Sequence, residues 1–493
     1  MNVHLHKLLL IFALISCNTL AQEPVRYIYL DSPTYQYIDY LINSGQTLPE
    51  FVLYQPYDIK ILSDTLATSR SEKYFNEYWR YYYGKKDISG QLLLADRVNY
   101  HGALFNRYQA TGGVHLATPY ATFANRTRID QDYKHDPNYA GDLSEAEDWL
   151  YGRVNDAYLN VNYKGFQLFY GRMQRNWGAI DSPGLILSYN PYSYDHFLFF
   201  YRYKNLKISM IFARLEDLNT RTYADPEKII PNARKYVVGH RLDIAFSGNF
   251  QMGFSEMATY GGQDRDIELA FFNPMNFYYG IQRNDKKQMD GFWAVDLFYK
   301  PISKLTLYGQ LLIDDIIVNN DPGVDDRARY PDRLGIMIST RSGDMFLPGL
   351  NLNLTYVRIW NRTYQSKYTW ENYHYRELGL GYPCAACEEV KFKFSYWDLF
   401  PLYLHNEFIW GRYGKVHLTD LYPLKKEDFP IAPVTENIIN NFYLHYFYSN
   451  NLTVYARLQY VKDKKHYSNR IDQYQGFAVS FGVDFLLSGH LGL

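Results

Sequence analysis

Long runs of strict two-residue alternation limit most strongly how this chain can fold. Residues 155–162, 305–313, 350–356 and 452–460 place apolar side chains at nearly every second position, with mainly Asn, Thr, Tyr, Arg or Gln between them. Successive side chains of a β-strand point to opposite faces, so these runs predict strands with one apolar and one polar face. Strands of about 9–11 such residues are typical of membrane β-barrels, whereas strands of soluble sheets are nearer 5–6 residues.

The connections between these runs also alternate in character. Short turns are expected near Asn205, 301–303 and 449–451. Long polar loops are expected at about 127–148, 215–235, 319–332, 361–375 and 414–438. Short turns at one end and long loops at the other are typical of outer-membrane barrels. With roughly 22 residues per strand and connection, residues 88–493 predict an all-β transmembrane barrel of about 16–18 antiparallel strands.

Composition excludes two other classes of protein. Past the first residues no apolar run approaches the length of about 20 that a membrane-spanning helix needs, which excludes a helical membrane protein. The formal net charge is −1, so no electrostatic argument supports nucleic acid as a partner. The 51 Tyr and 30 Phe fit the aromatic girdles and polar lumen of a barrel.

The first 21 residues resemble a secretory signal peptide. Lys7 precedes the apolar run 8–15, which is far too short to span a membrane, and Ala21 ends a small-residue cleavage pattern. A lipobox reading, with Cys17 as a lipidated N-terminus, remains the alternative. Either reading predicts export through the Sec pathway to the outer membrane of a Gram-negative bacterium.

Residues 22–87 differ from the rest of the chain and predict helices. Pro33 suits a first helical turn, residues 37–42 carry an apolar stripe, and Gly45 stands where a C-terminal cap belongs. The segment has too few apolar residues to form a stable domain by itself. We therefore expect a periplasmic, plug-like helical segment at 22–87 docked on a barrel at 88–493.

Two cysteines, Cys384 and Cys387, predict a local disulfide in an oxidising compartment. A zinc ribbon needs two such pairs, and a thioredoxin-like redox site needs a βαβ context that is lacking. The sequence thus predicts no metal site and no cofactor.

Candidate binding residues are aromatic or basic. Rings that stack on sugars, mixed with Asn and Arg, predict a polysaccharide-binding set of Trp360, Tyr364, Trp370, Tyr373, Trp177 and Tyr192. The alternative is that these rings serve as girdle or loop packing. Arg172, Arg175 and Arg241 are expected in the lumen, either facing an anionic polymer or paired in a structural charge network.

One short motif has an enzymatic reading. His466 and Ser468 share a strand face, and the string HYSN is similar to the site of outer-membrane lipid A deacylases. The acidic third member is missing, because Ser480 stands where it would be and Asp472 lies too near. A deacylase is therefore a minor alternative, beside a porin-like channel or a secretion accessory barrel.

Several segments together resemble the Wzi capsule assembly family. They are 35–45 and 55–57, YGR at 170–172, WG at 177–178, LILS at 185–188, GHRLD at 239–243, GFSE at 253–256, NP at 273–274, YGQ at 308–310, DD at 314–315 and LGLGYP at 378–383. In the last segment Tyr382 replaces a histidine of the family pattern. The resemblance implies a monomeric, lectin-like barrel with no enzymatic activity, which contacts outer-membrane lipid, holds exported capsular polysaccharide or exopolysaccharide and helps assemble or retain capsule.

Overall fold

A computed structural model describes residues 24–46, 49–62, 70–83, 87–100, 104–131, 151–222, 225–316, 332–422, 427–463 and 475–492. Cys17 and the motif containing His466 and Ser468 lie outside these residues. Among the described helices, none has the length and apolar character needed to cross a membrane.

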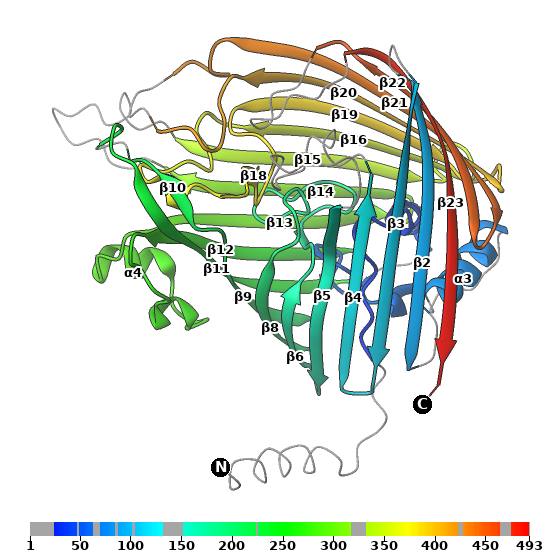
Figure 1. Cartoon of the computed structure of the whole chain (residues 1–493), viewed down its shortest axis with the longest axis horizontal. Coiled ribbons are helices and arrows are strands. Elements are labelled where there is room, and N and C mark those ends of the chain that lie inside the picture. The colour runs from blue at the N-terminus through cyan, green and yellow to red at the C-terminus, as the bar shows by residue number, and fades with distance from the viewer. Residues whose placement is uncertain are drawn as a thin grey trace, which may run out of the picture.

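Eighteen antiparallel strands close a barrel, which confirms the predicted fold class (Figure 1). The ring closes where the last strand pairs with the first, from Ile88 opposite Leu491 to Tyr100 opposite Val479. The strands are β2 (Ile88–Tyr100), β3 (Leu104–Ala117), β4 (Ala121–Asp130), β5 (Tyr151–Tyr163), β6 (Phe166–Arg172), β8 (Asp195–Tyr203), β9 (Leu206–Arg214), β11 (Ile230–Ser247), β12 (Phe250–Gly262), β13 (Asp290–Ile302), β14 (Leu305–Asp315), β15 (Arg333–Gly343), β16 (Leu350–Ile359), β19 (Cys387–Tyr396), β20 (Leu402–Gly414), β21 (Val434–Ser449), β22 (Leu452–Val461) and β23 (Gly476–Leu491). The short β10 (Leu218–Thr220) pairs with β11 outside this ring.

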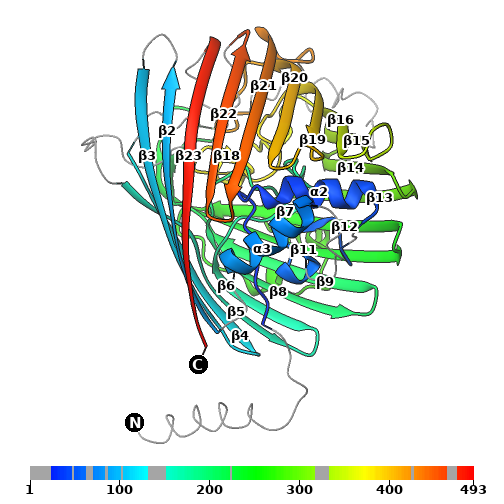
Figure 2. The same cartoon turned by 90° about the vertical axis from the view of Figure 1, so that its right-hand side faces the viewer.

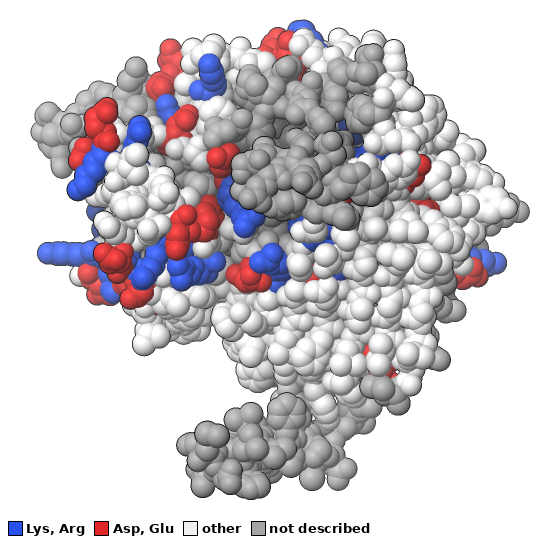
Figure 3. Space-filling model, in the orientation of Figure 1, with Lys and Arg blue, Asp and Glu red and all other residues white. Residues whose placement is uncertain are grey.

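The two ends and the outer wall of the barrel differ in chemistry. Two-residue turns such as 164–165 and 204–205 form one end, and the long loops form the other. Lys, Arg, Asp and Glu gather at the long-loop end, at the left of Figure 3, whereas much of the wall is free of charge. Outward residues such as Leu168, Phe199 and Leu354 are 40–52% exposed. This is the apolar outer band that a bilayer requires.

The described residues 24–46, 49–62 and 70–83, which we call the plug, lie inside the barrel at the short-turn end (Figure 2). The plug contains α2 (Thr34–Ser44), β1 (Tyr54–Gln55), η1 (Ile59–Leu62) and α3 (Arg70–Tyr83). The predicted C-terminal cap is present, since Gly45 has φ 81° and closes α2 by bonding to Ile42 and Leu41. The Tyr40 and Tyr74 hydroxyls bond to the strand turns at Asp344 (3.0 Å) and Ser449 (3.2 Å).

Two connections from the long-loop end fold inward onto the plug. The inner loop, residues 173–194, includes β7 (Asn176–Trp177), which pairs with β1 of the plug. The outer loop, residues 360–386, includes η4 (Thr369–Glu371), β17 (His374–Tyr375) and β18 (Leu378–Gly379). It rests on the inner loop, because Ser188 donates to Leu380 O at 2.8 Å. Plug, inner loop and outer loop thus form one continuous packed column in the lumen.

A third connection takes the opposite route. The external segment, residues 263–289, contains η3 (Leu269–Phe272) and α4 (Tyr278–Asn284). Figure 1 shows α4 outside the wall beside β11 and β12. It forms a separate buried cluster with outward-facing side chains of the wall.

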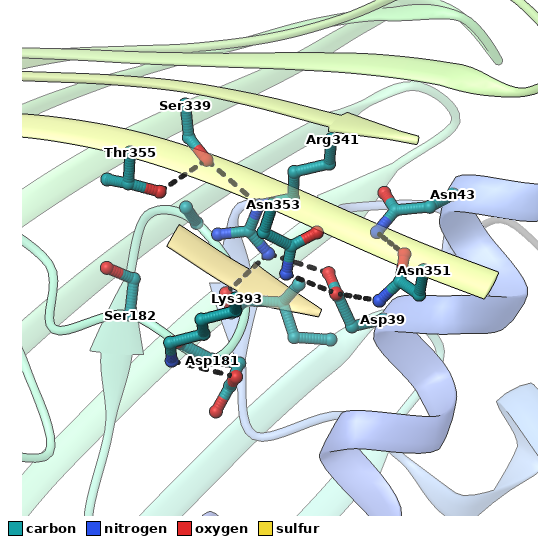
Figure 4. Close-up of polar contacts among 12 residues, drawn as sticks. Asp39, Asn43, Asp181, Ser182, Ser339, Arg341, Asn351, Asn353, Thr355 and Lys393 are labelled. Carbon is teal, nitrogen blue, oxygen red and sulfur yellow. Dashed lines mark hydrogen bonds and ion pairs between the residues drawn. The ribbon is translucent and has the colours of Figure 1, made fainter. Parts of the chain in front are cut away.

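One buried carboxylate joins the plug to both the wall and the inner loop (Figure 4). Asp39 of α2 accepts hydrogen bonds from Arg341 of β15 at 2.6 Å and from Asn351 and Asn353 of β16 at 2.9 and 3.0 Å. The same Arg341 donates to Ile180 O of the inner loop at 2.8 Å. Because both charged side chains are about 2% exposed, each is stable in the lumen only in the presence of the other.

Asp39→Ala should therefore weaken the attachment of the plug. The change leaves the Arg341 guanidinium buried without its anion, and breaking a buried pair costs about 3–5 kcal/mol. We expect a lower thermal midpoint in detergent and faster proteolysis within residues 24–83.

The matched control is Tyr40→Phe on the same helix, which removes a hydrogen bond to the part-buried Asp344 carboxylate, worth about 1.5–3 kcal/mol, and leaves no buried charge without its partner. Equal behaviour of the two variants would show that Asp39 is not what holds the plug.

Candidate functional site

The structure separates the six predicted sugar-binding aromatic residues into two groups. Trp177, Tyr364 and Tyr373 have no exposed surface, and Trp370 retains 7%. Trp360 and Tyr192 are partly buried. The polysaccharide-binding role of the set stays a prediction, but in this conformation only partly buried rings such as these two offer a polymer an accessible face.

The buried rings support the inward loops. The Tyr364 hydroxyl donates to Leu185 O and the Tyr373 hydroxyl to Ile186 O, both at 2.6 Å. Trp177 lies against Tyr54 of the plug, with ring centroids 5.9 Å apart. These contacts fix the stacking of outer loop on inner loop and of inner loop on plug.

The three predicted lumen arginines have different surroundings. Arg241 is fully buried and ion-paired with Asp243 at 2.8 Å and with Asp296. Arg172 pairs with Asp195 at 2.7 Å near the surface. Arg175 is 3% exposed, donates to His196 at 2.7 Å and lies 4.3 Å from the Phe169 ring. For Arg172 and Arg241 these contacts match the structural-network alternative, because a carboxylate already occupies each guanidinium.

Cys384 and Cys387 form a disulfide in the outer loop. Both cysteines are buried. Cys387 is the first residue of β19, and Cys384 lies three residues before it. The bridge therefore closes the loop where it returns to the wall.

The long-loop end holds a cavity of about 360 Å³, which we call the outer cavity. Its lining comes from the outer loop, the external segment and the strand ends beside them. The lining residues are Gln282, Gln288, Met289, Asp290, Asp315, Arg333, Gln365, Ser366, Lys367, Tyr368, Glu371 and Tyr422. A partly exposed Tyr ring, amides and carboxylates are the groups that stack on sugar rings and bond to their hydroxyls.

Arg333 organises the charge of the outer cavity. Its guanidinium lies 3.1 Å from Asp314, 3.4 Å from Asp315 and 3.6 Å from Asp290. It also donates to the backbone oxygen of Gln365, which ties the outer loop to β15. Three acidic groups thus surround the Arg333 guanidinium, which is therefore not available to an anionic ligand.

Glu371 closes the cavity from the outer loop. Its carboxyl group accepts hydrogen bonds from Ser366 at 2.7 Å and from Gln288 of the external segment at 2.8 Å. Burial, reinforced by the nearby Asp290 carboxylate, raises the pKa of Glu371 to about 8. The group is therefore mostly protonated at neutral pH.

A second cavity of about 610 Å³ lies in the lumen between the plug and the wall formed by β20–β23, β2 and β3. Rings on neighbouring strands line one side, with His445 5.6 Å from Tyr403 and 5.7 Å from Tyr455. Arg97 and Arg457 lie over Tyr455 and Tyr443. The packed column thus leaves this side of the lumen unfilled, and a further cavity of about 690 Å³ lies between the plug and β5, β6, β8 and β9.

The outer-cavity residues Gln288, Arg333, Tyr368 and Glu371 were not among the sequence candidates. Tyr368 and Glu371 lie within the loop selected for its aromatic content, so that signal indicates a segment that lines the outer cavity. Asp290 and Arg333 are the first residues of β13 and β15. No local pattern in the sequence indicates that these two residues lie close together.

Raising the pH should destabilise the outer loop through Glu371. Its folded pKa lies above the ordinary value of 4.5, so its contribution is fully present below about pH 4.5 and is lost as the pH rises past about 8. Glu371→Gln keeps a neutral group and should be more stable than the parent protein at pH 9.

The measurement is the difference in thermal midpoint between parent and variant from pH 4 to 9. Asp285→Asn, on the exposed C-terminal cap of α4, is the control. A difference that does not change with pH would contradict the assignment.

Comparison with solved structures finds 335 chains that match the fold. Wzi of Escherichia coli, described as an outer-membrane protein involved in group 1 capsule assembly and a carbohydrate-binding β-barrel, is 13% identical with a TM-score of 0.61. The alignment covers 96% of this chain and 100% of that one. OpdK of Pseudomonas aeruginosa is 11% identical with a TM-score of 0.46, covering 82% and 99%.

Comparison at the level of sequence gives fewer matches than comparison of structures. No curated protein matches the chain. The family model described as capsule assembly protein Wzi matches residues 106–369, which is more than half of the chain and runs from β3 into the outer loop. This protein therefore belongs to the Wzi family of capsule assembly proteins.

Proposed function

We propose that this protein binds exported polysaccharide at the cell surface and helps assemble or retain capsule, without catalysing a reaction. The plug faces the periplasm, the long-loop end faces outward, and the protein works as a monomer. The E. coli relative is described as a carbohydrate-binding barrel, which supports the substrate class.

The observation that carries the proposal is a barrel whose lumen is largely packed, with a polar and aromatic cavity at its long-loop end. A packed column of three chain segments disfavours a transport pore. The outer cavity presents Tyr368, Gln288 and Asp315 to solvent, which suits sugar hydroxyls better than acidic groups. A repeating polymer needs no deep pocket, since many weak contacts combine through effective concentration.

Replacing the accessible rings of the outer loop should weaken polysaccharide retention. In the double variant Trp360→Ala and Tyr368→Ala, each lost ring removes about 1 kcal/mol of contact, the scale of aromatic interactions. Multivalency amplifies that loss over a polymer. The measurement is capsule retained on cells that carry each variant.

Tyr108→Ala is the matched control, because this ring is 50% exposed on the outward face of β3. Heat-modifiable migration on gels checks that all variants assemble. Wild-type retention by an assembled double variant would remove the outer loop as the binding surface.

The porin-like alternative has its own test, because the second cavity leaves part of the lumen open. We expect the intact protein to conduct little in planar bilayers and deletion of residues 22–87 to raise single-channel conductance. Large conductance that is equal before and after the deletion would favour a channel. For the deacylase alternative, Ser468→Ala should leave lipid A acylation unchanged.

A further inference from the structure

The external segment lies on the side of the wall that faces lipid. Its Phe272 and Phe271 rings pack on Phe212 of β9 and Tyr260 of β12, each pair with centroids 4.4 Å apart. Its Tyr278 ring lies 4.8 Å from His240 of β11. The three wall residues point away from the lumen, because their neighbours along the strands are the ones that point inward. Ala213 belongs to the main core cluster, Arg241 lies over the Trp177 ring, and Thr259 donates to Glu371 O of the outer loop.

Beneath this segment the wall carries a carboxylate on its outward face. Glu256 of β12 is 4% exposed. Its oxygens accept hydrogen bonds from the Tyr278 and Tyr279 backbone at 3.0 and 3.3 Å and from the Trp293 indole at 2.8 Å, and His240 lies 3.1 Å away. A bare carboxylate against hydrocarbon would be costly, so the segment shields a polar patch on the outer wall between β11 and β13.

Phe254 is the next outward-facing residue of β12 toward the short-turn end, and it indicates where the wall begins to face the hydrocarbon of the membrane. Phe254 is 39% exposed and lies one side-chain step, roughly 7 Å, from Glu256. Trp293 of β13 is 42% exposed and borders Tyr279 of the segment, with centroids 5.7 Å apart. A half-exposed Trp at the border of an apolar band marks the membrane interface.

The segment itself has an uncovered apolar rim. Leu269, Met275 and Phe277 are 83, 79 and 73% exposed, and Ile267 and Tyr279 are about half exposed. Exposing so many apolar side chains to water within thirteen residues is energetically unfavourable. The rim borders the lipid-facing wall, so hydrocarbon is the neighbour that the surroundings supply.

The charges of the segment balance one another. Glu268 pairs with Arg265 at 2.8 Å and with Lys287, and Asp266 pairs with Arg234 of β11. The other four charged residues, Asp264, Arg283, Asp285 and Lys286, are exposed and comprise two of each sign, so the segment has no net charge that would select a charged partner protein. The apolar rim is therefore the feature that decides what the segment binds.

We propose that the external segment inserts its rim of Leu269, Met275 and Phe277 among the acyl chains of the outer leaflet, and so anchors the long-loop end of the barrel at a fixed depth. This goes beyond polysaccharide binding. The occupant is lipid, and its chemistry is that of fatty acyl chains.

Site-specific quenching tests the anchor. The variants Leu269→Cys, Phe277→Cys and, as the matched control, Asp285→Cys at the end of α4 are labelled with bimane without reductant, which leaves the native disulfide closed. The full-length protein is reconstituted into vesicles of phosphatidylethanolamine and phosphatidylglycerol. 5-doxyl phosphatidylcholine, included as a substantial fraction of the lipid, serves as the membrane quencher and iodide as the aqueous one.

Labels at 269 and 277 should lose most of their emission to the doxyl lipid and resist iodide, whereas the label at 285 should show the reverse. Iodide quenching at all three positions would overturn the proposal by placing the rim in water. Protection of 269 and 277 from both quenchers would also overturn it, by showing a second copy or another protein on the rim. Capsule retention is not measured, so failure here is distinct from failure of the proposed function.

Discussion

The ion pair between Asp39 and Arg341 is the interaction on which the filled barrel depends. It joins a helix near the start of the chain to a strand about three hundred residues later, and it also holds the inner loop through Ile180 O. Either charge alone would be intolerable at this depth, because burial without a partner costs several kcal/mol. The plug, the wall and the inner loop are therefore stable in one mutual arrangement.

Tyrosine makes the packed lumen possible. An inward loop presents many backbone carbonyls that water cannot reach, and each needs a donor. Tyr364 and Tyr373 supply one each while their rings fill space, and Tyr35 does the same within the plug at Ile28 O. A leucine would fill the same volume and leave the carbonyl without a partner, which explains why so aromatic a chain uses so much tyrosine.

The features that a local sequence pattern encodes are predicted correctly from the sequence. Alternation located β14, β16 and β22, the strand count of 18 lies at the upper edge of the predicted range, and Gly45 correctly marked the end of α2. Alternation cannot show where a long connection goes. Loops 173–194 and 360–386 turn inward because of contacts between residues more than a hundred positions apart, such as Ser188 with Gly381 at 2.6 Å. Segment 263–289 turns outward because of contacts with outward-facing side chains of three strands, such as Phe212 of β9. For that reason the sequence predicts Trp177 and Tyr364 to be accessible, whereas both are buried in the structure.

The pairing of β2 with β23 has a consequence for biogenesis. The plug precedes β2 along the chain, and the strand that completes the ring is the last one synthesised. The plug lies at the short-turn end, and the inner and outer loops enter the lumen from the long-loop end. Each can therefore reach its place through an end of the barrel, whereas no segment can pass through the wall once β2 and β23 are paired. Closure of that seam fixes how many strands surround the plug, and with that number the space that the plug and the two loops have to fill.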